Sequence, residues 1–301
     1  MDFTEAQNAI LGLLGNVSVD ALPKIIHWMR ASSDFEDFII SNNDVILRSI
    51  SEDLRSSLPV DAMVSSESQA IQTIQNLKQP TLHVDAFLYD DETVDTLCNE
   101  GKMSRNYCLS CGSTHTAAID FLSHSFSLLE LKFLFQHVLP DLTGKTLIDV
   151  GSRLGAVLYA GYVYSSANHL YGVEINAEFC DLQEKTIQKY QFSDRIKVYQ
   201  SDICSQKSLL QDADVVVLNN VFEYFLEKEN QLKAWAFLNE NLRKRGTLLV
   251  TVPSLKESLG KLQMNIDLGH WVEEIDLHTN VYLGEELDQQ ALNDIHLYAV
   301  R

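Results

Sequence analysis

Residues 146–155 read Thr-Leu-Ile-Asp-Val-Gly-Ser-Arg-Leu-Gly, and residues 170–174 read Leu-Tyr-Gly-Val-Glu. The first stretch predicts a buried strand that ends in a glycine turn, and a helix is expected over residues 154–166. The second stretch predicts another buried strand, which ends on a carboxylate. The order of strand, glycine turn, helix, strand and acid is typical of a parallel sheet that binds a nucleotide-like cofactor at the carboxyl ends of its strands.

The glycine turn indicates the kind of cofactor. A dinucleotide site uses Gly-x-Gly-x-x-Gly to place pyrophosphate on a helix N-terminus, whereas here Asp149 precedes Gly151 and Gly155. A carboxylate at that point would repel pyrophosphate and attract the cationic amino-acid end of S-adenosylmethionine. Glu174 stands at the distance along the chain where a carboxylate meets the hydroxyls of a ribose. An adenosine-containing cofactor is therefore expected.

Later segments continue the pattern. Residues 196–202 predict a third strand that ends in an acid, and residues 213–219 predict an apolar fourth strand. Asn-Asn-Val-Phe-Glu-Tyr-Phe follows at 219–225, then a predicted helix over 228–243 and a strand within 245–253 that ends in proline. A glycine turn alone would also fit an ordinary strand–helix junction. The ordered segments after it favour the cofactor-binding interpretation.

Residues 128–301 resemble the class I, Rossmann-like methyltransferases that depend on S-adenosylmethionine, and among them the type 11 and type 12 domains. The resemblance implies an α/β fold with a doubly wound, mostly parallel seven-stranded sheet. Residues 271–277 and 294–300 would be the last two strands, the final one antiparallel. It implies methyl transfer to an unidentified small molecule or protein. The alternatives are a protein lysine or other N-methyltransferase of the non-SET type, and a non-catalytic scaffold or adenosylmethionine-binding module.

The resemblance also assigns residues to the cofactor. The acid and glycines of the turn would lie at its methionine end, Glu174 at the ribose, Asp202 at the adenine amine and Asn219 beside the sulfonium. Arg153 stands where a middle glycine is usual, and we expect it to fit only with a negative φ or an opened turn, which would weaken cofactor binding. The predicted cofactor-binding set is Asp149, Gly151, Ser152, Arg153, Gly155, Glu174, Ile175, Asp202, Ile203 and Asn219.

The predicted catalytic residues lie mainly after the fourth strand, because that end of an open sheet lines the ligand cleft. An amide at Asn219 or Asn220 can orient an acceptor, and Glu223 or Tyr224 can reach it or accept its proton. Capping of the next helix is the alternative role for these residues. His124, upstream of the sheet, can also accept a proton, although a lone histidine is more often a surface or capping residue.

Three regions are expected along the chain. Residues 1–80 show helical periodicity and predict a small helical N-terminal region. Residues 81–127 are a connecting segment and candidate lid, with a strand predicted over 82–89. Residues 128–301 form the Rossmann-like domain, beginning with an amphipathic helix over 129–138. The helices of the first region are expected to be separated by polar breaks at 16–18, 32–34 and 41–43.

Cys108 and Cys111 form a Cys-x-x-Cys pair whose two thiolates could bind one zinc ion. Cys98 and His115 could complete the four ligands. A strong zinc prediction needs a second such pair, which the chain lacks, so buried thiols or a redox pair are the alternative. Five cysteines without a regular framework indicate a reducing compartment, either cytosol or nucleus.

The net charge of −19 over 301 residues argues against nucleic acid as a substrate, since acids outnumber bases in both halves of the chain. Such a surface favours a small molecule or a basic protein segment as methyl acceptor. A hydrophobic content of 46% predicts a fully folded chain. The sequence shows neither a signal peptide nor a long apolar run, so no membrane partner is expected, and it does not indicate the oligomeric state.

Overall fold

The computed structural model describes residues 3–31, 34–59, 62, 81–108, 116–118, 120–223, 225–277 and 292–301. The chain divides into two compact units, Met1–Val45 and Ile46–Arg301. The division differs from the regions expected from the sequence, because α3 (Asp34–Ser57) continues from the first unit into the second.

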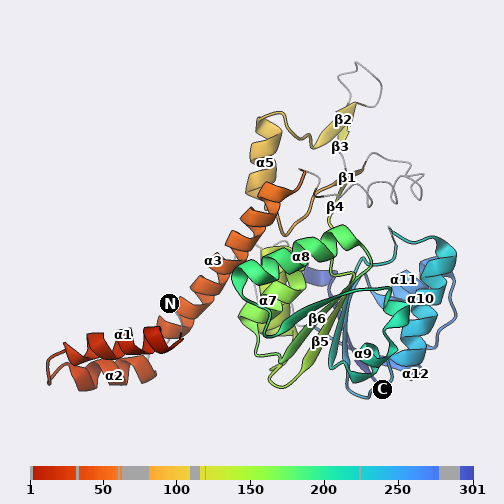
Figure 1. Ribbon diagram of the computed structural model, residues 1–301. Helices are drawn as coiled ribbons and strands as arrows, with labels where there is room; N and C mark the ends of the chain where they lie inside the picture. Colours follow the sequence, from red (N-terminus) through yellow and green to blue (C-terminus); the bar gives the residue numbers. More distant parts are fainter. Residues whose placement is uncertain are drawn as a thin grey trace. The chain divides into compact units, whose positions relative to one another are not determined.

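The first unit contains helix α1 (Phe3–Gly15), helix α2 (Leu22–Ala31) and the beginning of α3 (Figure 1). The polar stretch at 16–18 does separate α1 from α2. The break predicted at 41–43 is wrong, because α3 runs through it. Further along α3, Leu47, Ile50 and Leu54 are fully or almost fully buried. Burial of this apolar face outweighs the low helix propensity of the two asparagines before it.

The second unit is built on a seven-stranded sheet in the order β10-β11-β9-β8-β5-β6-β7. Neighbouring strands from β9 to β7 pair in parallel, and β11 is antiparallel to both β9 and β10. The predicted fold class and reversed last strand are confirmed. The strands are β5 (Thr146–Val150), β6 (His169–Glu174), β7 (Ile196–Gln200), β8 (Val215–Asn219), β9 (Leu248–Val252), β10 (Val272–Ile275) and β11 (His296–Val300).

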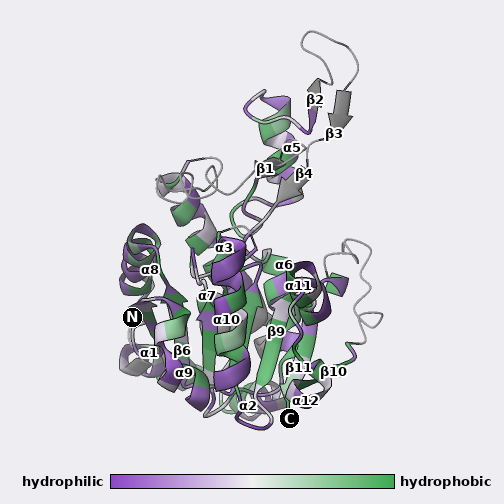
Figure 2. Cartoon of the chain, turned by 90° about the vertical axis from the view of Figure 1, so that its right-hand side faces the viewer, coloured by the Kyte–Doolittle hydropathy of each residue, from purple (hydrophilic) through white to green (hydrophobic). Residues whose placement is uncertain are grey.

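Helices cover both faces of this sheet because its strands are apolar on both sides. In β5, Leu147 belongs to one buried cluster and Ile148 to the other, as the two-residue period of a strand requires. The strands β9 and β11 are green in the hydropathy view of Figure 2. The helices are α6 (Leu128–Phe133) with its continuation η1 (Leu134–Val138), α7 (Ala156–Tyr164), α8 (Ala177–Tyr190), η2 (Ile203–Ser205), α9 (Lys207–Asp212), α10 (Lys228–Asn241), α11 (Leu255–Leu262) and α12 (Leu268–Trp271).

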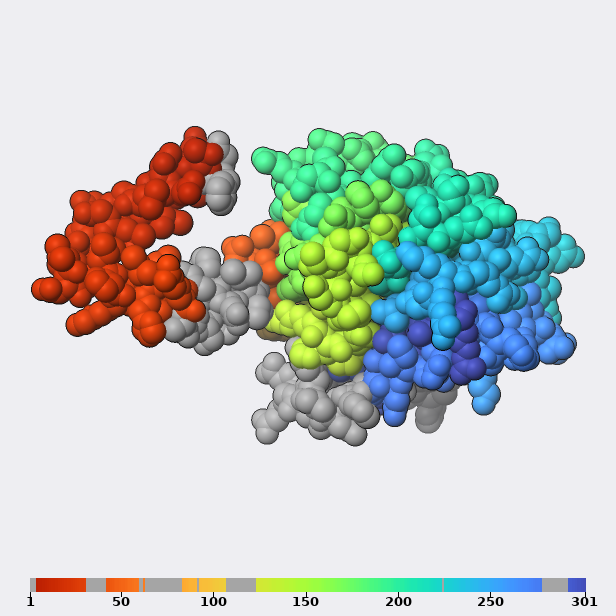
Figure 3. All heavy atoms as spheres, turned by 90° about the horizontal axis from the view of Figure 1, so that it is seen from below, coloured from red at the N-terminus to blue at the C-terminus, as the bar shows by residue number. Residues whose placement is uncertain are grey.

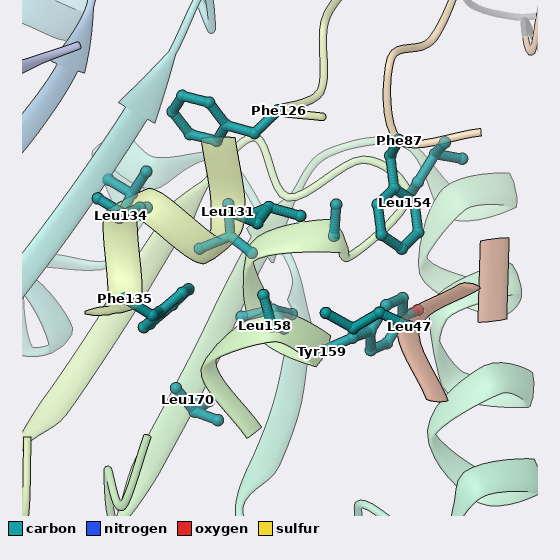
Figure 4. Packing of buried hydrophobic residues seen from close by; sticks show 14 of the residues in the cluster. Leu47, Phe87, Phe126, Leu131, Leu134, Phe135, Leu154, Leu158, Tyr159 and Leu170 are labelled. Carbon is teal, nitrogen blue, oxygen red and sulfur yellow. The ribbon is translucent and has the colours of Figure 1, made fainter. Parts of the chain in front are cut away.

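The larger buried cluster lies on the face covered by α6, α7 and α8, and it includes Leu47 of α3 and Phe87 (Figure 4). The second cluster packs α10, α11 and α12 on the other face around Trp235 and Trp271. In Figure 3 the described side chains of residues 128–301 form one closely packed body. No helix in the described ranges is both long and apolar enough to cross a membrane.

The segment before the sheet contains the short strands β1 (Thr81–His83) and β4 (Asp120–Leu122), which pair in parallel. It also contains α5 (Asp91–Asn99) and the antiparallel pair β2 (Asn106–Cys108) and β3 (Thr116–Ala118). The strand predicted over 82–89 is wrong beyond His83. Asp85 starts a turn there: its Oδ1 accepts from the Phe87 N–H at 3.0 Å, and its carbonyl oxygen accepts from the next two N–H groups.

Candidate functional site

A cavity of about 850 Å³, the main cavity, lies at the carboxyl ends of β5, β6, β7 and β8. This is where ligands bind in open parallel sheets, and the volume suits a nucleoside-sized ligand. Its wall combines acidic side chains with a larger number of apolar ones. The lining residues include Gly151, Arg153, Glu174, Ile175, Glu178, Phe179, Asp202, Ile203, Asn219, Val221, Phe225 and His124.

The glycine turn (residues 151–155) has three residues in the left-handed region, with φ of 71° at Gly151, 43° at Arg153 and 84° at Gly155. A Cβ on Gly151 would lie 2.4 Å from Cγ2 of Val221, and one on Gly155 would lie 2.7 Å from the ring of Tyr159. Both positions therefore need glycine for conformation and for space. Of the two alternatives expected for Arg153, a negative φ or an opened turn, the negative φ is wrong.

Arg153 adopts this conformation because its backbone and its side chain are both held. Its N–H donates to Oε2 of Glu174 at 2.9 Å, and Nη1 lies 2.6 Å from Oδ2 of Asp85. Nη2 donates to the carbonyl oxygen of Ala62 at 2.8 Å, and the guanidinium carbon lies 4.9 Å from the centre of the Phe179 ring. These contacts offset a backbone cost of about 1–2 kcal/mol for a side-chain-bearing residue in the left-handed region.

The acids predicted for the cofactor lie at the ends of three neighbouring strands. Asp149 is buried in β5, and burial together with the Glu174 carboxylate raises its pKa to about 8. Glu174 ends β6 and also accepts from the Asn176 N–H at 2.7 Å, so its carboxylate joins the glycine turn to the start of α8. After β7, Oδ1 of Asp202 accepts from the Cys204 N–H at 2.8 Å. Of these acids, Glu174 and Asp202 line the main cavity and Asp149 does not.

Apolar side chains provide most of the remaining wall. Ile175 is 67% exposed although it follows a buried strand, and it faces the main cavity together with buried Ile203. Phe225 and Val221 close the cavity from the segment after β8. Our reading of the sequence missed these two residues, although apolar side chains in a loop between a strand and a helix are a signal for them. Ser152 is buried and, like Gly155, does not line the main cavity.

The predicted catalytic residues after β8 divide between two places. Asn219 lines the main cavity, whereas Asn220 and Glu223 line a separate hollow of about 10 Å³. Asn220 has φ of 49°, and its N–H donates to the carbonyl oxygen of Val252 at 2.7 Å. Oε2 of Glu223 lies 3.6 Å from Nζ of Lys261. Tyr224 lies outside the described residues.

His124 lines the main cavity and is 8% exposed. Its Nε2 lies 2.9 Å from Nδ1 of His83, and its ring centre lies 4.7 Å from that of Phe225. Burial, followed by the positive charge of Arg153 and by His83, lowers the pKa of His124 to about 2. The imidazole is therefore neutral at physiological pH and is a weak base.

The zinc prediction concerns residues at the edge of the described chain. Cys108 is the last residue of β2, while Cys111 and His115 lie outside the described residues. Cys98 is a free thiol in α5. Within the described ranges, no group of three or more histidine, cysteine or acidic side chains is arranged to hold a metal ion. The zinc site therefore stays a prediction.

The strand order and the reversed last strand define the class I, Rossmann-like methyltransferase fold. In agreement with this class, residues 148–250 match the family model described as "Methyltransferase domain". The match covers less than half of the chain, and no curated protein sequence matches the chain significantly.

Solved structures to which this chain is similar include an RNA methyltransferase from Salinibacter ruber in complex with S-adenosyl-L-homocysteine, at 19% identity and a TM-score of 0.36 over 57% of this chain and 88% of that chain. A precorrin-6Y C5,15-methyltransferase from Geobacter metallireducens has 14% identity and a TM-score of 0.37 over 57% and 85%. A precorrin 8W decarboxylase from Methanobacterium thermoautotrophicum has 15% identity and a TM-score of 0.36 over 58% and 89%. These values carry no inference about the acceptor of this chain.

Proposed function

We propose that this protein is a methyltransferase that uses S-adenosylmethionine and acts on a small molecule or a basic protein segment. The main cavity carries the proposal, because its wall brings Glu174, Ile175 and Asp202 together at the carboxyl ends of adjacent strands. Bound S-adenosylmethionine would supply an electrophilic methyl group on a sulfonium. The residues of the chain would bind and orient it and exclude water from the reaction.

The geometry of the wall fits an adenosine. Each oxygen of the Glu174 carboxylate accepts one backbone N–H, and these two hydrogen bonds orient the carboxylate in the cavity wall, where we propose that it meets the ribose hydroxyls. Ile175 offers an exposed apolar surface for a base, with Ile203 also in the wall. Oδ1 of Asp202 is engaged by Cys204, and the carboxylate retains acceptor capacity for an adenine amine.

The acceptor would lie beside Asn219, Phe225 and His124, all of which line the main cavity. The amide of Asn219 can orient an oxygen or nitrogen nucleophile without taking its proton. Because the pKa of His124 is lowered to about 2, we propose that this residue acts as a neutral part of the wall. Catalysis would then depend on positioning more than on a strong base.

The charge of the molecule supports the proposed class of acceptor. The net charge is −19, and Glu174, Glu178 and Asp202 all face the main cavity. A phosphate-rich substrate would be repelled, whereas a neutral molecule or a cationic segment such as a lysine-bearing peptide would not. The narrower proposal is a lysine or other N-methyltransferase of the non-SET type, and identification of the acceptor tests it.

The test is isothermal titration of the full-length protein with S-adenosylmethionine and S-adenosylhomocysteine. A largely preformed cavity should bind at about micromolar Kd. Glu174→Gln should weaken binding by about tenfold or more, since a charged hydrogen-bond acceptor is lost, whereas the exposed control Glu240→Gln should not change it. Wild-type protein that fails to bind either ligand at millimolar concentration would refute the proposal.

Transfer is then measured with a methyl-labelled donor against a panel of amines, hydroxylated small molecules and basic peptides. Label in one class of acceptor identifies the substrate class. Tight cofactor binding with no transfer to any member of the panel would favour the alternative of a non-catalytic adenosylmethionine-binding module.

A further inference from the structure

The side chain of Arg153 connects the glycine turn to residues much earlier in the chain. Its guanidinium contacts Asp85, which lies 68 residues before it, and the carbonyl oxygen of Ala62, which lies 91 residues before it. The side chains of Arg153 and Asp85 are only 7% and 1% exposed. A buried ion pair of this kind is costly to break from one side, because the remaining charge stays in a medium of low dielectric.

Asp85 carries this contact on to the loop that holds His124. The Oδ2 atom that meets Arg153 also accepts from Oγ of Ser125 at 2.6 Å, and Ser125 is the neighbour of His124 in the chain. On the other side, Oγ of Ser123 accepts from the Ala86 N–H at 2.9 Å. We call residues 83–89 and 123–126 together the pocket wall; among them, His124 is the residue that lines the main cavity. These hydrogen bonds connect the two segments of the pocket wall, and one of them is accepted by the carboxylate of Asp85.

We propose that Arg153 is a positioning residue that holds the pocket wall, and through it His124, against the acceptor end of the main cavity. The inference rests on the proposed function, because it concerns the acceptor side of the same cavity. The backbone of Arg153 takes a conformation that favours glycine, while its guanidinium is used to anchor the pocket wall. Arg153, at the third position of the turn, therefore makes side-chain contacts that a glycine there could not make.

Apolar packing is the competing explanation for how the pocket wall is held. Phe87 and Leu154 are buried in the same hydrophobic cluster, and both are labelled in Figure 4. If that packing were sufficient, the ion pair could be removed without loosening the wall. The two explanations therefore predict different behaviour of a variant that keeps Leu154 and Phe87 and loses only the guanidinium.

Hydrogen exchange on the cofactor-free protein distinguishes anchoring by the ion pair from anchoring by apolar packing. The variant is Arg153→Asn, because asparagine tolerates a positive φ. We expect exchange of the amides at 86–89 to rise by about tenfold or more, the size expected when a charged hydrogen-bond partner is lost. Exchange of the amides in β5 should not change. The control is Arg195→Gln, which removes a guanidinium bound to the carbonyl oxygens of Ser165, Ala167 and Tyr162.

A second readout is specific to the position of His124. Because the charge of Arg153 helps to lower the pKa of His124, an NMR titration should show a higher imidazole pKa in Arg153→Asn and no change in Arg195→Gln. Once an acceptor is known, Arg153→Asn should raise its KM, and Arg195→Gln should not.

Unchanged exchange at 86–89 would overturn the proposal. It would also be overturned if the amides of β5 lost protection in parallel, since Arg153 would then act on the glycine turn and the sheet themselves. If Arg153→Asn does not fold, Asp85→Asn takes its place, because it keeps an oxygen for the Phe87 N–H and removes the charge. A rise in the exchange of amides 86–89 in Asp85→Asn supports the proposal, and its absence overturns it. Failure of the wild type to bind S-adenosylhomocysteine refutes the proposed function, while the exchange data still decide the role of Arg153.

Discussion

Replacing Gly151 with alanine tests how closely the glycine turn and the segment after β8 are packed. The added Cβ would lie 2.4 Å from Cγ2 of Val221, and φ at this position is 71°. The left-handed conformation costs a side-chain-bearing residue about 1–2 kcal/mol, and forcing an extra methyl group into a packed site costs about 1–3 kcal/mol more. We therefore expect Gly151→Ala to lower the free energy of unfolding by about 2–5 kcal/mol.

Gly144→Ala is the matched control, because Gly144 has φ of 75° and a Cβ there would meet no atom within 4 Å. It should cost only the conformational part, about 1–2 kcal/mol. Val221→Ala removes the methyl group that clashes. In the double variant with Gly151→Ala, the two changes should therefore offset each other by about 1–3 kcal/mol in a double-mutant cycle.

The assay is urea unfolding followed by circular dichroism, with titration of S-adenosylmethionine on each folded variant. Since Val221 lines the main cavity, its displacement should also weaken cofactor binding in Gly151→Ala and leave it unchanged in Gly144→Ala. Equal destabilisation by the two glycine substitutions, or a cycle without coupling, would show that the contact with Val221 is not the reason for glycine.

The raised pKa of Asp149, about 8, means that the folded protein holds a proton that the unfolded chain releases near pH 4, so the free energy of unfolding should decline as the pH rises from about 4 to about 8. Asp149→Asn should flatten this part of the curve in urea titrations, and a decline that persists in the variant would contradict the assignment. Asn220→Ala and Glu223→Ala test the catalytic prediction: loss of turnover with melting temperature and cofactor affinity preserved supports it. Because Asn220 and Glu223 line the small hollow, the competing result is a lower melting temperature, which would indicate a structural role. If Cys108 and Cys111 bind structural zinc, elemental analysis should give about one zinc per chain and chelation should lower the melting temperature; substoichiometric metal with unchanged melting would leave them as ordinary thiols.

The centre of the sheet could be predicted from the sequence because β5, β8 and β9 are short and mostly apolar. The turn could be predicted because its two glycines stand at positions where a side chain would meet other atoms. The 146–150 strand and the 170–174 strand were placed within a residue of their observed bounds. The acids near the ends of these two strands could be located for the same reason, since a strand end is a local feature.

What could not be predicted depends on contacts between distant parts of the chain. The positive φ of Arg153 is stabilised by Asp85, Ala62 and Glu174, and no local pattern reveals that these residues meet. The strand expected over 82–89 has suitable apolar residues but stops where Asp85 makes its turn. The separation of Asn219 from Asn220 follows from the backbone conformation of Asn220, which places the neighbouring amides at different cavities.

The pairing of Asp85 with Arg153 also restricts how this protein can change during evolution. Loss of either side chain alone strands a charge in the interior, so single substitutions at these positions are expected to be removed by selection. The two positions should therefore change together: descendants with glycine at the third position of the turn should also have exchanged the acid for an uncharged residue. Such lineages would be free to change the pocket wall for a different acceptor. Lineages that keep the pair would inherit the same pocket wall and adjust specificity at other residues.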